Sequence, residues 1–207
     1  MPLRTSPFDY DLVLARAGLT RVVGVDEAGR GPVAGPVVAA AVLLDPDTPL
    51  PGLDDSKVLT PAARATLLPL VRRAALSLGV GIVDAPTIDA RNIREATRLA
   101  MRIAIENCLR GQRPRPQLVL IDGDFVANAM SGVPEQSLVK GDARARPIAA
   151  ASIVAKETRD RLMERLATRY PGYGFEIHKG YLTALHRDAL ARLGPSPVHR
   201  RTFRGAR

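Results

Sequence analysis

Acidic side chains follow three separate apolar runs of this chain. Asp26 and Glu27 come directly after one run, in the stretch GVDEAGRGPVAG, and Asp122 and Asp142 follow the runs LVLI and SLV. Ligand sites of open α/β sheets lie at the carboxyl ends of strands, so we expect these acids to gather there. Gathered carboxylates repel one another unless a cation lies between them. The pattern therefore predicts a site for hard divalent cations.

Such a site suits the hydrolysis of phosphodiesters. Two divalent ions about 4 Å apart can activate a water and stabilise the leaving oxygen. Residues 1–139 hold equal numbers of acidic and basic side chains, so the whole net charge of +9 lies in residues 140–207. Clustered positive charge of this kind favours a polyanionic substrate. Histidine ligation is not expected, because His178, His186 and His199 have no compact metal spacing.

Three specific interpretations of these residues have to be weighed. Gly29, Gly31 and Ala34 loosely match the dinucleotide fingerprint. However, the adjacent acids would repel a pyrophosphate and a strand follows where a helix is needed, so no nucleotide cofactor is expected. A DNA nuclease such as a junction resolvase, and a basic nucleic-acid-binding protein with structural acids, both stay open.

The hydrophobic patterning predicts one α/β domain with a basic, helical C-terminal part. We expect strands at 21–25, 37–44, 78–83, 118–121 and 137–139, and helices at 60–76, 88–110, 147–169 and 181–193. Pro69 should kink or interrupt its helix. No run is long and apolar enough to span a membrane, the N-terminus lacks a secretory signal, and Cys108 is the one cysteine. We therefore expect a cytoplasmic protein.

The neighbouring acids Asp26 and Glu27 pose a geometric problem. Successive side chains of a strand point to opposite faces, so these two converge on one ligand only where the strand ends. We expect the strand to break at Ala28 and Gly29, where glycine frees the backbone.

Seven motifs occur in a family order over nearly the whole chain. They are GVDEAGRGP from Gly24, DSK from Asp55, LIDG from Leu120, KGD from Lys140, AASIVAK from Ala150, YGFEIHKGY from Tyr173 and HRRTF from His199. Through them the chain resembles the bacterial ribonuclease HII enzymes, the type 2 ribonucleases H. The resemblance implies an RNase H-like fold with a mixed five-stranded sheet flanked by helices. It implies a single catalytic domain over residues 1–207, with a core at about 20–170 and a helical substrate-binding part at about 171–207.

The resemblance also implies an activity. The expected reaction is Mg²⁺- or Mn²⁺-dependent cleavage of RNA in an RNA–DNA hybrid, including a single ribonucleotide embedded in duplex DNA. The cut would fall on the 5′ side of the ribonucleotide and leave 3′-hydroxyl and 5′-phosphate ends, as ribonucleotide excision repair requires. We expect a monomer that does not bind to a membrane.

The family's residue roles carry over motif by motif. The metal-site acids map onto Asp26, Glu27, Asp122 and Asp142. The turn Gly29, Arg30 and Gly31 would recognise the ribose 2′-hydroxyl, and Tyr181 would sense the RNA–DNA junction. Contacts with the duplex backbone, or support of the site, are implied for Lys57, Ser152, Lys156, His178 and Lys179.

Three positions near these motifs need separate expectations. Many family members have a second lysine after DSK, where this chain has Val58, so one phosphate contact would be missing. Asp124 is expected to be a loop residue. Asp160 is expected to form a surface ion pair with Arg159 or Arg161.

Overall fold

The structure is a computed structural model that describes residues 8–206. Its elements are α1 (Asp9–Arg16), β1 (Val22–Ala28), β2 (Val37–Leu44), α2 (Pro61–Ala74), β3 (Ala75–Val83), α3 (Ala85–Arg91), α4 (Ile93–Leu109), β4 (Leu118–Asp122), β5 (Glu135–Leu138), the 3₁₀ turn η1 (Gly141–Ala143), α5 (Arg146–Arg169), α6 (Phe175–His178) and α7 (Ala184–Leu193).

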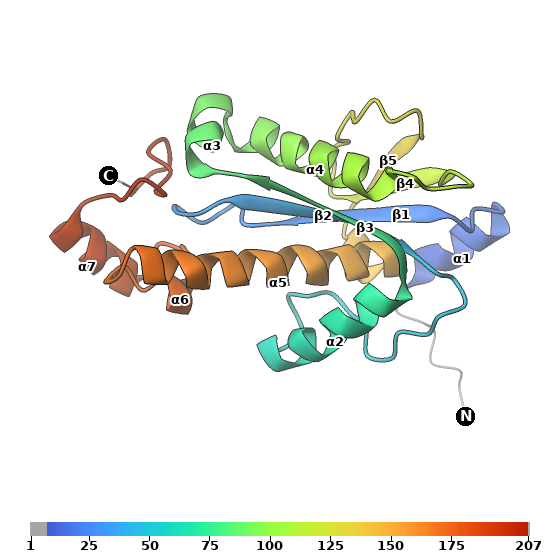
Figure 1. The fold of residues 1–207 in the computed structure, drawn as a ribbon, viewed down its shortest axis with the longest axis horizontal. Coiled ribbons are helices and arrows are strands. Elements are labelled where there is room, and N and C mark those ends of the chain that lie inside the picture. Colours follow the sequence, from blue (N-terminus) through green and yellow to red (C-terminus); the bar gives the residue numbers. More distant parts are fainter. Residues whose placement is uncertain (1–7, 207) are drawn as a thin grey trace.

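The strands form one mixed sheet in the order β3-β2-β1-β4-β5. The pairs β1–β2 and β2–β3 are antiparallel, whereas β1–β4 and β4–β5 are parallel. Helices α3 and α4 cover one face of the sheet and α5 runs along the other, with α2 outside α5 (Figure 1). The predicted mixed five-stranded α/β fold is therefore confirmed.

The core is aliphatic and is divided by the sheet. Val23 and Val25 of β1 pack with α4, whereas Val22 lies on the α5 face with Leu120. Gly24 also faces α5, and a Cβ there would collide with the main chain of Pro147. The absence of a side chain at Gly24 thus lets the start of α5 lie directly on β1. This contact matters for the site, because Asp142 precedes α5 by one short turn.

Several predicted boundaries need correction. β1 does not end at Val25 but continues through Ala28, in unbroken register with β2. Pro69 does not interrupt α2, which begins with the expected Thr60 cap and a proline at its first position. The predicted helix 88–110 is two helices, because Asn92 adopts φ 66° between them and caps the second by accepting a hydrogen bond from the Glu95 N–H.

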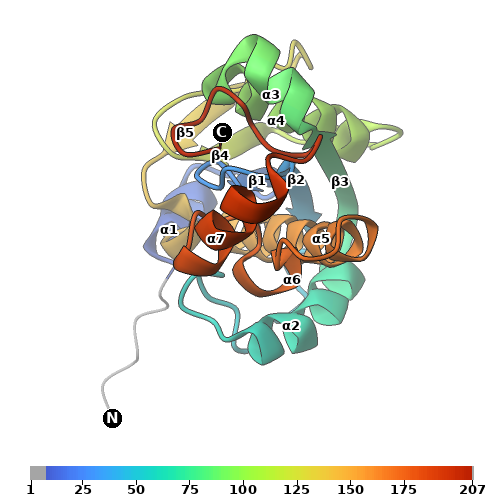
Figure 2. The ribbon, with the colours of Figure 1, turned by 90° about the vertical axis from the view of Figure 1, so that its left-hand side faces the viewer.

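The C-terminal part lies across one end of the sheet. Figure 2 faces this end and shows α6, α7 and the final segment close to the end of α5. Phe175 of α6 and Leu190 of α7 pack with Ala34 and with Met163 of α5. Helix α7 begins at Ala184 rather than at Tyr181, so Tyr181 stands in the loop before it. Among residues 8–206, no helix combines the length and apolar character that a membrane crossing requires.

Candidate active site

Three aspartates come together where β1, β4 and η1 meet. Carboxylate oxygens of Asp26, Asp122 and Asp142 all lie within 4.8 Å of one another. The parallel register pairs Val25 with Ile121, so Asp26 and Asp122 occupy the next position of each strand. Because side chains alternate along a strand, both acids lie on the same face as Val22 and Leu120, which is the face covered by α5. The carboxylate of Asp122 accepts a hydrogen bond of 2.7 Å from the Gly141 N–H. That bond holds the Asp142 turn against β4.

The electrostatics of the cluster favour a bound cation. Asp26 and Asp142 are each only 3% exposed. Burial raises the pKa of Asp26 well above its ordinary value, and the charges of Glu27 and Asp122 raise it further. Burial and the charge of Asp142 likewise raise the pKa of Asp122. Oxygen donors alone, with mutual repulsion that a cation would relieve, suit a hard divalent metal.

Glu27 is not one of the three clustered acids. The strand ends at Ala28 and Gly29 as expected, and Gly29 adopts φ +95°, but the side chains keep alternating up to Ala28, so this end comes too late to turn Glu27 toward the face of Asp26. The Glu27 carboxylate accepts a hydrogen bond of 3.2 Å from Arg30 Nη1, and its own N–H donates to Asp26 Oδ1 at 2.7 Å. Burial raises the pKa of Glu27 and the pairing with Arg30 lowers it, and the net result is a pKa above the ordinary value. Glu27 thus stands beside the cluster and joins it to the glycine turn.

One pocket of about 260 Å³ adjoins these acids. Most of the residues predicted to touch substrate line it beside Asp26 and Glu27, namely Gly29, Arg30, Gly31, Lys57, Ser152, Lys156 and Tyr181. Tyr181 is 49% exposed, and a Cβ on Gly31 would lie 3.7 Å from its ring. Asp26, Glu27, the glycine turn and Tyr181 therefore share one cavity, although Gly31 and Tyr181 are 150 positions apart in the sequence, whereas Asp122 and Asp142 are not part of its lining.

The supporting polar residues have definite partners. Lys57 Nζ contacts the carboxylate of Asp142, and Ser152 hydrogen-bonds to Ser56. Partial burial alone would lower the pKa of Lys57, but its hydrogen bond to Asp142 and the charge of Asp26 raise it above the ordinary range. Lys57 is thus a stable cation beside the acid cluster.

Two predicted contact residues lie outside the pocket lining. The His178 ring is buried, with Nε2 bonded to the Tyr173 carbonyl and Nδ1 accepting from the Gly180 N–H. Lys179 pairs with Glu164 at 2.8 Å. Of the two alternatives the resemblance implied, the position of His178 favours support of the site, because it holds the residue before Tyr181.

Comparisons with known proteins agree with this geometry. The family model described as "Ribonuclease HII" matches residues 23–206. A ribonuclease HII of Geobacter sulfurreducens is 52% identical over 200 residues, which cover 97% of this chain and 89% of the relative. The chain belongs to the ribonuclease HII family.

Solved structures show the same fold. The ribonuclease H2 of Pyrococcus horikoshii OT3 superposes with a TM-score of 0.73 at 30% identity, covering 90% of this chain and 95% of that one. Bst-RNase HIII, solved in complex with Mn²⁺, gives a TM-score of 0.77 at 20% identity, covering 94% and 70%. As a member of the ribonuclease HII family, this chain is a metal-dependent hydrolase that cleaves the RNA strand of RNA–DNA hybrids.

Two arginines behind the glycine turn of this ribonuclease HII chain were not predicted. Arg159 was one of the two expected partners of Asp160, with Arg161, but its buried guanidinium donates to the carbonyls of Ala34, Pro36 and Lys179. Asp160 pairs instead with Lys156 and Arg64. Helical spacing was the available signal, since Arg159 continues the buried stripe of α5 through Ile148, Ser152 and Ala155. Arg200, expected to belong to a basic surface, is fully buried.

The three histidines have no compact spacing in the sequence, but the fold brings them together. His178 and His186 stack with ring centroids 4.3 Å apart, and His186 Nε2 lies 2.9 Å from His199 Nε2. They form a hydrogen-bonded cluster beneath the Tyr181 loop rather than a metal cluster, because their remaining ring nitrogens bond to main chain or to Ser196.

Three arginines surround Phe125 at the edge of the pocket. The guanidinium carbons of Arg30, Arg94 and Arg98 lie 5.4 to 5.6 Å from the centroid of the Phe125 ring. Arg30 pairs with Glu27 and Arg98 with Glu95, whereas no ion pair among residues 8–206 involves Arg94. This Phe125 arginine cluster extends the positive charge from the pocket along α4.

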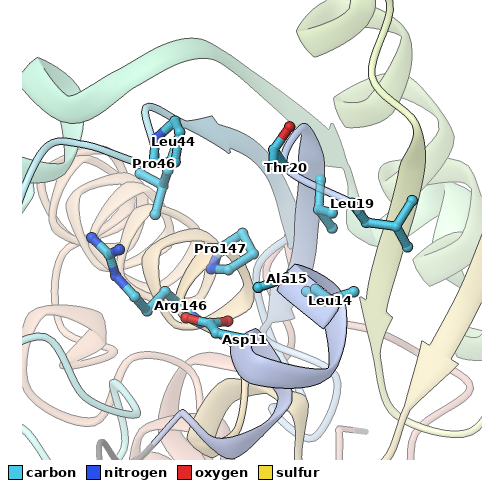
Figure 3. A pocket seen from close by; sticks show the side chains of 10 residues that line it. Asp11, Leu14, Ala15, Leu19, Thr20, Leu44, Pro46, Arg146 and Pro147 are labelled. Carbon is cyan, nitrogen blue, oxygen red and sulfur yellow. The ribbon is translucent and has the colours of Figure 1, made fainter. Parts of the chain in front are cut away.

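A second cavity of about 250 Å³ lies between α1 and the start of α5 (Figure 3). Its lining is mainly apolar and includes Leu14 and Pro147, and Asp11 at its edge accepts a hydrogen bond of 3.1 Å from the Arg146 N–H. It shares no lining residue with the active-site pocket. We assign no role in the reaction to this cavity.

Proposed function

We propose that this chain is an endonuclease that cuts on the 5′ side of single ribonucleotides embedded in duplex DNA, as well as within RNA–DNA hybrids. The products would carry 3′-hydroxyl and 5′-phosphate ends, as needed to begin ribonucleotide excision repair. The observation that carries the proposal is the shared pocket, in which Asp26 lies beside the Gly29–Gly31 turn and Tyr181. Catalytic acids and sugar-recognising groups within one cavity can couple cleavage to the presence of a ribose.

The acids would hold Mg²⁺ or Mn²⁺. Asp26, Asp122 and Asp142 supply clustered carboxylates, and Glu27 would complete the set from the adjacent edge of β1. Two bound ions would activate the attacking water and stabilise the leaving 3′-oxygen. We propose that Lys57, cationic and in contact with Asp142, orients that carboxylate and offers its remaining donors to a substrate phosphate.

The recognition groups act through shape as well as polarity. Gly31 has no side chain, so its backbone can approach a sugar while the Tyr181 ring packs against it. Tyr181 would stack on the sugar and place its hydroxyl at the junction. Arg30 is tied to Glu27 and lies on Phe125, so its peptide groups are held beside the acids.

A cleavage assay with three duplexes tests this proposal. The substrates are a DNA duplex with one embedded ribonucleotide, the same duplex without it, and a DNA four-way junction, each with Mg²⁺ or Mn²⁺. We expect cleavage of the first alone, and its loss in Asp142→Asn. Cleavage of the junction would favour a resolvase, whereas salt-dependent binding without cleavage would favour a binding protein.

We further propose that the protein acts as a monomer in the cytoplasm. Cys108 is a free thiol, fully buried, and burial raises its pKa to about 11, so it is poorly reactive. Sedimentation of the purified protein at several concentrations, with and without reductant, tests the monomer. A species of twice the mass would overturn it.

A further inference from the structure

We propose that His199 and Arg200 are positioning residues that hold the two halves of the ribonucleotide-recognition site, the Gly29–Gly31 turn and Tyr181, in register. This role rests on the proposed function. Neither His199 nor Arg200 is part of the lining of the active-site pocket. The two residues are neighbours in the segment after α7, and their side chains serve different halves. His199 leads through a second histidine to Tyr181, and Arg200 leads directly to the turn.

Arg200 organises the turn through its carbonyl groups. Its guanidinium donates to the carbonyl oxygens of Gly29 at 2.6 Å, Arg30 at 2.9 Å and Gly35 at 2.9 Å. No ion pair among residues 8–206 involves Arg200, although it is fully buried. Burial lowers its pKa to about 9, so it still carries its charge at neutral pH. A buried charge needs compensation, and here the carbonyls of the turn supply it.

This contact decides where the N–H groups of the turn point. In a planar trans peptide, the carbonyl and the N–H point in opposite directions. Because the Gly29 and Arg30 carbonyls point at Arg200, the N–H groups of Arg30 and Gly31 point away from it. Neither N–H donates a hydrogen bond to any atom of the described residues, and both residues line the active-site pocket. Arg200 thus leaves two donors free for an oxygen of the substrate.

His199 holds the other half through a chain of hydrogen bonds. The Ser196 N–H donates to His199 Nδ1 at 2.9 Å, so in the neutral ring the proton is on Nε2. That Nε2–H donates to His186 Nε2 at 2.9 Å, which leaves the His186 proton on Nδ1. The Nδ1–H in turn donates to the Tyr181 carbonyl at 2.9 Å. The bonds assign one set of tautomers and end at the residue that would touch the sugar.

Main-chain bonds tie the two halves to each other and to the same segment. Val33, just beyond the turn, donates to the Gly180 carbonyl at 3.0 Å and accepts from the Arg200 N–H at 2.8 Å. Arg159 bridges the same two segments, since it donates to both Ala34 and Lys179. Residues that face a substrate need such support to hold a productive geometry. These contacts of Val33, Arg159 and Arg200 therefore fix the distance between the Gly29–Gly31 turn and Tyr181.

Binding to two duplexes tests the role of Arg200. Arg200→Lys keeps the charge but cannot reach all three carbonyls, and Arg204→Gln at an exposed position is the matched control. With Ca²⁺ in place of the catalytic metal, we expect Arg200→Lys to lose about tenfold or more of the preference for a ribonucleotide-containing duplex over all-DNA. Mn²⁺ affinity should stay within twofold, and Arg204→Gln should keep the preference. An unchanged preference in folded Arg200→Lys would overturn the proposal.

A measurement on the wild-type protein covers the case in which a variant does not fold. Nitrogen-15 NMR of the histidine rings should show the proton on Nε2 of His199 and on Nδ1 of His186. The amide signals of Arg30 and Gly31 should shift on binding the ribonucleotide duplex, and not on binding all-DNA. The opposite tautomers, or equal shifts with both duplexes, would overturn the proposal. If wild type itself shows no preference for the ribonucleotide duplex, the proposed function fails instead.

Discussion

Asp26 and Glu27 are neighbours in the chain, yet their carboxylates serve different partners on the two faces of β1. Asp26 lies with Asp122 and Asp142, whereas Glu27 pairs with Arg30. The Glu27 N–H donates to the Asp26 carboxylate at 2.7 Å, so the two residues are still coupled. One dipeptide therefore connects the acids that would bind metal to the turn that would recognise the sugar.

This division predicts unequal effects for the two neutral substitutions. Asp26→Asn should lower kcat at least about a hundredfold, because a bound metal contributes several kcal/mol to the transition state. Glu27→Gln should weaken Mn²⁺ binding less than Asp26→Asn, since Glu27 lies outside the cluster of three. Titration with Mn²⁺ by calorimetry, beside single-turnover cleavage, checks both. Equal losses of Mn²⁺ affinity would contradict the assignment.

The raised pKa of Asp26 predicts a stability effect in the metal-free protein. Its folded pKa lies above the ordinary value of 3.8, so the folded state binds the proton more tightly and stability falls as pH rises between the two values. At neutral pH Asp26 therefore contributes less to stability than it does below pH 3.8. Asp26→Asn should raise the Tm by a few degrees in EDTA at pH 7, and by less at pH 4. Thermal unfolding monitored by circular dichroism tests this sign, and a lower Tm in EDTA at pH 7 would contradict it.

The two glycines of the turn should respond differently to alanine. Gly29 has φ +95°, and a Cβ there would strike Arg159, so Gly29→Ala should destabilise the fold by about 1–3 kcal/mol. At Gly31 the only neighbour within 4 Å of a Cβ, among residues 8–206 and apart from the adjacent residues of the chain, would be the Tyr181 ring, at 3.7 Å. Gly31→Ala should thus keep its Tm but raise KM for the embedded ribonucleotide. Urea unfolding and steady-state kinetics separate the two, and an unfolded Gly31→Ala would contradict this description of the turn.

The histidine cluster predicts acid sensitivity. Burial lowers the pKa of His199 from 6.5 to about 4, and it also lowers that of His186. The unfolded chain then binds protons first as pH falls below 6.5, so stability should decrease from there toward pH 4. His199→Gln removes this titration, so its Tm should change less over that window than the wild-type Tm. Equal slopes of Tm against pH for His199→Gln and wild type would show that His199 does not contribute to the loss of stability in acid.

The Phe125 arginine cluster predicts a salt-dependent contribution to binding. Arg94 is exposed, lies on Phe125 and takes part in no ion pair among the described residues, so it is available for a phosphate. Arg94→Gln should weaken binding of all duplexes alike and lower the salt slope by about 1. Arg204→Gln at the far end of the chain is the comparison. A loss confined to the ribonucleotide duplex would instead place Arg94 at the recognition site.

Residues 200–207 contain four arginines, but their deletion would not be a clean test of phosphate binding by this basic segment. Arg200 is buried behind the glycine turn, and Ala206 is also buried. Such a deletion would remove the support of the turn together with the surface charge. Single changes at exposed positions such as Arg204 separate the two effects.

Local pattern was enough to predict most of the helices and strands, whereas the mixed five-stranded sheet was expected from the resemblance to the family. Buried strands show as β-branched runs, and Thr60 followed by proline marked the start of α2. Boundaries were harder, because the polar residues Asp26 and Glu27 hid the continuation of β1. Its ladder with β2 is a long-range contact that carries the strand on from Val25 to Ala28, just before the turn at Gly29.

The sequence by itself determined which residues are the candidates for the chemistry, because acids at strand ends and a Gly-Arg-Gly turn are visible in the residue types alone. Only the tertiary structure decided which of them share a face, since alternation along an unbroken β1 separates Glu27 from Asp26. It also decided the partners of Arg159, Arg200 and the three histidines. Their roles depend on carbonyl groups and rings brought together by the fold, and no spacing along the chain encodes those contacts.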